Sequence, residues 1–132
     1  MSYGSAVALQ AAIFTALAGA AASAGVSVLD AMPSGTGSGT FILIGPEDVR
    51  DQSDKTGGGA EHHLTVSVIS DAAGFHAAKT IAVAVCDALD GAGLSLARGH
   101  LVNLSFERAK ALRLDAGSAR RIDLRFRARV QD

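Results

Sequence analysis

The sequence has no tryptophan, one tyrosine and one cysteine, and each shortage removes a class of function. With so few large aromatic rings, the chain lacks the usual platforms on which proteins stack single-stranded bases. The single cysteine, Cys86, excludes an intrachain disulfide and a cysteine metal cluster. A chain without disulfides is typical of a reducing compartment such as the cytosol.

Basic residues are missing from the amino terminus, where a secretory signal peptide would need them. The apolar stretch that follows Tyr3 is rich in alanine, so it predicts a soluble helix. Its side chains are too small, and glycine interrupts it too often, to favour a membrane span. We therefore expect no membrane partner.

Composition predicts one folded domain over residues 1–132, because 48% of the residues are hydrophobic and 19% are charged. The net charge of −1 conceals an asymmetry. Residues 1–71 carry two basic and seven acidic side chains, whereas residues 72–132 carry ten basic and six acidic ones. An acidic half and a basic half can attract copies head to tail, as in a ring, although unequal halves also arise by chance.

The first half of the chain predicts one helix and two strands. Alanine-rich sequence with Leu9, Ile13 and Leu17 on one stripe predicts a helix from Ser5 to about Ala22. Ser34–Gly39 is expected to be a flexible connector. Phe41–Ile44 predicts a strand with two apolar faces, ended by Gly45-Pro46.

A long polar loop is expected from Glu47 to Gly59, and such loops are usually functional or disordered. His63–Ser70 alternates apolar and polar residues, which indicates a half-buried strand. Ser70-Asp71 is then expected to cap a second helix that runs to about Leu89.

The second half predicts a long hairpin. The segment from His100 to about Lys110 is expected to be a strand with one apolar face, formed by Val102, Leu104 and Phe106. Together these elements predict an α+β two-layer domain in the order α-β-β-α-β-β, with both helices on one face of a four-stranded antiparallel sheet. The length of the final hairpin suggests that it projects beyond the domain.

The last strand has the most regular pattern in the chain. Apolar residues at every second position from Ile122 to Val130 alternate with Arg121, Asp123, Arg125, Arg127 and Arg129. A period of two places four arginines on one face of a strand. Three interpretations stay open: a solvated surface, salt bridges to a neighbouring subunit, or contact with a nucleic-acid backbone through Arg120–Arg129.

Residues that could support chemistry are few. Glu61, His62 and His63 form the best metal candidate, but adjacent histidines in a strand point to opposite faces. Cys86 lies on the apolar stripe of the second helix, which predicts a buried small side chain. We therefore expect no enzyme activity, no metal and no cofactor, with a metal-dependent enzyme using Glu61, His62 or His63 as a rival hypothesis.

Three stretches carry a resemblance to a known family: Gly45-Pro46-Glu47-Asp48-Val49-Arg50-Asp51, Gly59-Ala60-Glu61-His62 running into Ser70-Asp71-Ala72-Ala73-Gly74-Phe75, and Arg121–Arg129. With the Ser5–Leu17 opening, the chain resembles the tail terminators of long-tailed phages, above all those of bacterial gene transfer agents. For Ser34–Gly39 there is no family pattern to match.

The resemblance implies a homo-hexameric ring at the head-proximal end of a tail tube, assembled in the bacterial cytoplasm. Such a ring stops tube polymerisation, contacts the tail tube protein and a head completion protein, and lets DNA pass through its centre. The family has no active site and needs no cofactor. The residues that we expect at its protein interfaces are Glu47, Asp48, Arg50, Asp51, Asp54, Lys55, Arg121, Arg125, Arg127 and Arg129.

Overall fold

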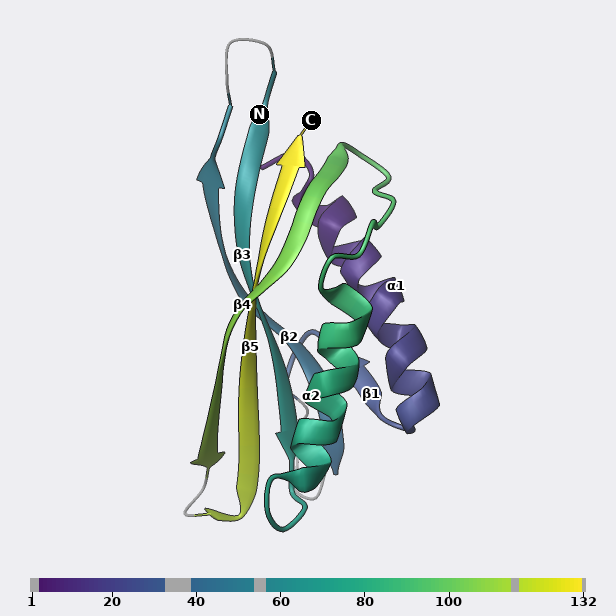
Figure 1. The fold of residues 1–132 in the computed structure, drawn as a ribbon, viewed down its shortest axis with the longest axis vertical. Helices are drawn as coiled ribbons and strands as arrows, with labels where there is room; N and C mark the ends of the chain where they lie inside the picture. Colours follow the sequence, from purple (N-terminus) through teal and green to yellow (C-terminus); the bar gives the residue numbers. More distant parts are fainter. Residues whose placement is uncertain (1–2, 33–38, 54–56, 115–116, 132) are drawn as a thin grey trace.

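Two helices cover one face of a single sheet, in a computed structural model that describes residues 3–32, 39–53, 57–114 and 117–131. The elements are α1 (Ala6–Ala24), β1 (Ser27–Leu29), β2 (Thr40–Asp51), β3 (Gly59–Ser70), α2 (His76–Leu89), β4 (His100–Leu114) and β5 (Ala119–Gln131). Figure 1 shows twisted strands that follow the long axis, with α1 and α2 on the same side. The expected two-layer α+β arrangement is confirmed.

The sheet has five strands and is mixed, which corrects the four-stranded antiparallel sheet expected from the sequence. Its order is β1-β2-β3-β5-β4. The additional strand, β1, pairs parallel to β2, with Ser27–Leu29 opposite Phe41–Leu43. Three residues are too few to display an alternating pattern, so no periodicity predicted this strand.

Strand β2 continues through Gly45-Pro46, where the sequence predicted its end. The register shifts between Ile44 and Glu47, so the glycine and the proline lie in a bulge. Proline is tolerated there because β1 pairs only with Phe41–Leu43 and leaves the rest of β2 as an edge. The expected Glu47–Gly59 loop is therefore shorter, since Glu47 to Asp51 belong to the strand.

The second helix begins later than expected. Ser70 is the last residue of β3, and its hydroxyl lies 2.7 Å from the hydroxyl of Thr40 and accepts a hydrogen bond from the backbone N–H of Ala72. Phe75 occupies the N-cap position of α2 without a side-chain cap. The predicted cap at Ser70-Asp71 is wrong because strand pairing with β2 uses Ser70.

The main core lies between the helices and the two central strands. Leu64, Val66 and Val68 of β3 lie opposite Phe126, Leu124 and Ile122 of β5. These side chains form one cluster with α1 and α2, to which α1 contributes Leu9, Ile13 and Leu17. Phe126 is fully buried and meets Phe106 edge to face, with 5.8 Å between the ring centroids. The one-sided pattern is confirmed for β5. In β3 the predicted inward residues face the core, but Ser67 and Ile69 on the opposite face are buried as well.

Strand β4 departs from the simple alternation that its sequence indicates. Its register against β5 shifts between Leu101 and Asn103 and again between Phe106 and Arg108. As a result Leu101 and Leu104 are buried, whereas Val102 is exposed. The predicted inward face of Val102, Leu104 and Phe106 is therefore wrong for Val102, because a bulge changes which residues face the core.

The two long hairpins close at opposite ends of the sheet, as Figure 1 shows. The β4–β5 hairpin was expected to project freely, but α2 packs beside it. The guanidinium groups of Arg113 and Arg120 each lie 5.8 Å from the centroid of the Phe75 ring. These contacts tie the far end of the hairpin to the start of α2.

We expect Phe126→Ala to lower the free energy of unfolding by about 3–5 kcal/mol, because it removes a fully buried aromatic ring from a packed core. Chemical denaturation followed by circular dichroism measures the change. A loss below about 1 kcal/mol would show that the β5 faces are assigned the wrong way round.

Candidate protein-interaction face

The side of the sheet that faces away from the helices is largely polar, and we call it the polar face. Its side chains form rows that cross the strands in the order β2, β3, β5, β4. One row consists of Arg50, Glu61, Arg129 and Asn103, and the next of Asp48, His63, Arg127 and Ser105. Acidic and basic groups on neighbouring strands stabilise such rows by roughly 0.2–1 kcal/mol per pair.

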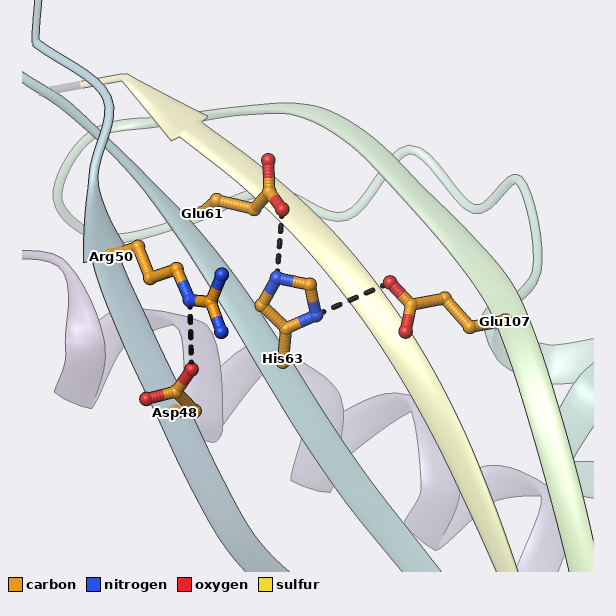
Figure 2. Close-up of polar contacts among 5 residues, drawn as sticks. All are labelled: Asp48, Arg50, Glu61, His63 and Glu107. Carbon is orange, nitrogen blue, oxygen red and sulfur yellow. Dashed lines mark hydrogen bonds and ion pairs between the residues drawn. The ribbon is translucent and has the colours of Figure 1, made fainter.

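His63 lies at the centre of these rows and contacts two carboxylates. Its Nε2 is 2.7 Å from Oε1 of Glu61, and its Nδ1 is 3.2 Å from Oε1 of Glu107 (Figure 2). Glu61 comes from β3 and Glu107 from the second bulge of β4, so the ring spans β5. A neutral imidazole has one N–H and can donate to only one of them, whereas the protonated ring donates to both.

Asp48 and Arg50 form an ion pair along the edge strand β2. Arg50 Nε lies 3.1 Å from Asp48 Oδ2, and both side chains are more than half exposed. Figure 2 shows this pair beside the His63 contacts, on the same face. An exposed pair of this kind contributes little to stability, so both side chains are available to a partner.

At the other end of the polar face, Asp123 joins β3 and β5. Its Oδ1 accepts hydrogen bonds from the Ser67 hydroxyl at 2.6 Å and from Arg121 Nε at 2.7 Å. Lys110 of β4 lies opposite Asp123 in the register. Arg121 is therefore held in place rather than free in solvent, and its side chain is only 26% exposed.

The remaining arginines of β5 differ in their surroundings. Arg127 is exposed. Arg129 reaches the backbone oxygen of Gln52 at 3.4 Å. The Nε of Arg125 is buried and, among the described residues, has no hydrogen-bond partner. The sequence predicted the shared face correctly, but it did not predict that only one of these side chains would be well exposed.

The polar face carries a net charge of +3 over the described residues. Seven cationic side chains (Arg50, Arg108, Lys110, Arg121, Arg125, Arg127 and Arg129) lie on it with four carboxylates (Asp48, Glu61, Glu107 and Asp123). Arginine binds carboxylates bidentately and is weakly hydrated, which suits it to protein interfaces. The rigid rows can therefore bind a partner surface on which charges of both signs alternate.

One corner of this side of the sheet is apolar. Phe41, Leu43 and Ile69 are buried together, with Leu29 of β1 packed against them. The continuous run Phe41–Ile44 indicated a strand with two apolar faces, and this is confirmed because Ile42 and Ile44 pack on the main core. The sequence did not reveal Leu29 and Ile69 as members of this second cluster.

Two other predicted interface residues lie elsewhere, and two are not described. Glu47 faces the helix side, where its Oε2 lies 3.2 Å from Nδ1 of the fully buried His62. Asp51 accepts hydrogen bonds from the backbone N–H and hydroxyl of Ser53, at 3.2 and 2.6 Å. Asp54 and Lys55 lie outside the described residues, as does Ser34–Ser38 of the predicted connector.

The geometry does not bring a metal site together. His62 and His63 point to opposite faces of β3, as predicted, with His62 in the core and His63 on the polar face. Within the described ranges, no group of three His, Cys, Asp or Glu side chains is placed to hold a metal ion. The Nε2 of His62 is buried with no hydrogen-bond partner in that part of the chain.

Arg120 does not belong to the polar face. Its guanidinium lies against Phe75 on the helix side, together with that of Arg113. Its Nη1 donates to the backbone oxygen of Gly117 at 2.6 Å. A nucleic acid that bound the polar face would therefore not meet the whole segment Arg120–Arg129.

We expect Arg127→Ala to change the free energy of unfolding by no more than about 0.5 kcal/mol, because the side chain is exposed. Thermal and urea unfolding of the purified chain measure this, with Phe126→Ala as the matched core variant on the same strand. A large destabilisation by Arg127→Ala would contradict the assignment of this side chain to a free surface.

Cys86 is half-buried on α2, and burial raises the pKa of its thiol above the ordinary value, with Asp90 and Asp87 adding to the effect. The thiol therefore stays protonated to higher pH, and the thiolate is the form that reacts. We expect the alkylation rate with iodoacetamide to rise at higher pH in the folded chain than in the urea-unfolded chain. Equal profiles would refute the shift.

Known proteins share the sequence features and the fold described above. The chain matches the family described as Tail completion protein gp17 over residues 7–131. It is also similar to a chain in a solved structure described as the virion of a native gene transfer agent particle, with 55% identity and a TM-score of 0.91. That match covers 99% of this chain and 100% of the other. A search of curated proteins finds no match. The resemblance found in the sequence is confirmed: the chain belongs to the tail completion protein gp17 family.

Proposed function

We propose that this protein is the tail terminator of a phage-like gene transfer particle. In this role, copies form a ring at the head-proximal end of the tail tube, end its polymerisation and bind a head completion protein. DNA passes through the ring without sequence-specific contacts. We propose six copies, as the family resemblance implies, and assembly in the bacterial cytoplasm.

Full-length similarity to a chain of a gene transfer agent virion is the observation that carries this proposal. The polar face supports it, because an ordered sheet surface with charges of both signs suits docking against another folded protein. Among the described residues, the metal arrangement considered from the sequence does not come together. A structural role therefore agrees best with the site.

We assign the contacts with the tail tube and the head completion protein to the polar face. Asp48, Arg50, Arg125, Arg127 and Arg129 are the side chains that we expect to take part.

Binding of a nucleic acid to this face is the weaker alternative. Four carboxylates lie among the cationic side chains, and the contacts of Arg50 and Arg121 are with acidic groups of the same chain. A surface of mixed charge repels phosphates where its carboxylates lie. DNA binding would weaken steeply as the salt concentration rises. If no DNA binding is detected in a titration at low salt, the assignment of this face to protein contacts stands.

Removal of the gene from a producing strain tests the proposal. We expect particles with tails of uncontrolled length, or heads without tails, by electron microscopy. Complementation with the wild-type chain should restore normal particles, whereas Arg127→Ala should restore fewer because it weakens a contact. Normal tails in the absence of the protein would refute the proposal.

A further inference from the structure

The outer face of α1 is apolar and open to solvent. No Asp, Glu, Lys, Arg or His occurs between residues 1 and 29. Val7 is 84% exposed and Phe14 is 44% exposed, although the opposite side of the helix is packed in the core. By length and composition α1 could even cross a bilayer. A helix with a second apolar face is normally covered there too, and among the described residues nothing covers Val7 and Phe14.

A second apolar surface lies on the far flank of the molecule. It is a groove of about 390 Å³ between α2 and the helix-facing side of the β4–β5 hairpin. Val83 and Cys86 line it from α2, and Phe106, Ala109 and Ala111 line it from β4. Val83 is 60% exposed and Phe106 is 41% exposed. The two alanines leave room that larger side chains fill elsewhere in the core.

The two surfaces lie at opposite edges of the sheet and on flanks of opposite charge. α1 packs against β1 at one edge, whereas α2 packs against β5 and the other edge strand, β4. Outside the polar face, residues 3–32 and 39–51, which build the first flank, carry three acidic side chains (Asp30, Glu47 and Asp51) and no lysine or arginine, a net charge of −3. Outside the polar face, residues 76–114, which build α2 and β4, carry three basic side chains (Lys79, Arg98 and Arg113) and two acidic ones (Asp87 and Asp90), a net charge of +1.

We propose that α1 of one copy docks with its outer face in the groove between α2 and the β4–β5 hairpin of the next copy. This inference rests on the proposed ring and names the surfaces that close it. Phe14 and Val7 enter an apolar groove, while the acidic flank of one copy faces the basic flank of its neighbour. Because the two surfaces differ, the contact is heterologous and repeats around a ring.

The proposal separates two kinds of contact on this protein. Apolar flanks join copies to one another, which suits a permanent interface. The polar face is then left for the tail tube and the head completion protein. A membrane is the other cover that an uncharged helix could find, but it offers no counterpart to the groove or to the opposite charges of the flanks.

Substitution in the groove gives the first test. We expect Val83→Asp to weaken self-association at least about a hundredfold, because it would bury a carboxylate in a largely apolar contact. Val102→Asp is the matched control, since Val102 is similarly exposed on β4 but does not line the groove. Native mass spectrometry and light scattering on the full chain measure the oligomer, and circular dichroism checks that both variants fold.

Cross-linking gives a test that does not depend on destabilising the contact. Cys86 is the only cysteine in the chain and lines the groove. Ala11 is exposed on the outer face of α1. We expect Ala11→Cys with a short bis-maleimide, at mildly alkaline pH, to give a ladder of covalent oligomers that stops at the size of the ring. The wild type has one cysteine per chain, so the cross-linker can join at most two copies. Ser53→Cys is the control: it lies between β2 and β3, away from both surfaces, and should give no ladder.

A ring that forms only on the tail tube would give no oligomer in solution. The same cross-linking is therefore also applied to intact particles that carry Ala11→Cys. An intact oligomer with Val83→Asp, or a native oligomer without the Ala11→Cys ladder, would overturn the docking proposal and leave the ring standing. Absence of any oligomer in solution and in particles would instead refute the ring. Flotation of the full chain with phospholipid vesicles, abolished by Val7→Asp, would overturn the proposal in favour of a membrane.

Discussion

The pairing of β3 with β5 at the centre of the sheet is the constraint on which the rest of the structure depends. Leu64, Val66 and Val68 lie opposite Phe126, Leu124 and Ile122, and all six pack under the helices. Side chains in a strand alternate between two faces, so this burial forces every intervening residue of both strands to the other side. A shift of one residue in the register would place arginines in the core, which fixes the pairing strongly.

The polar face is the direct consequence of this register. Because Glu61 must lie opposite Arg129, and His63 opposite Arg127, acidic and basic groups meet across strands β3 and β5, whereas β5 itself presents three successive arginines at positions 125, 127 and 129. The bulge in β4 adds Glu107 to the second nitrogen of His63. Contacts within the chain hold these side chains in position, so a partner at this proposed interface would bind a surface that is already ordered. Less conformational entropy is then lost on binding than for free lysines or arginines.

The arrangement also explains how a small structural protein can serve several partners. The polar face, the outer face of α1 and the groove beside α2 point in different directions, so occupation of one does not block another. Their chemistry differs, since the first carries charges of both signs and the other two are apolar. The proposed role needs such separate surfaces, because copies that bind one another would also have to bind the tail tube and a head completion protein.

The sequence alone determined the helices, the central strands and which of their residues face the core, because periods of 3.6 and 2 report burial directly. It also determined that the arginines of β5 share one face. Only the tertiary structure decided the additional strand β1, the continuation of β2 past Pro46, the bulges in β4 and the partners of His63. Each of these depends on which strands lie side by side, and pairing over long sequence separation leaves no local pattern. The opposed apolar flanks became visible in the same way, since Phe14 and Val83 look like core residues until the fold leaves them uncovered.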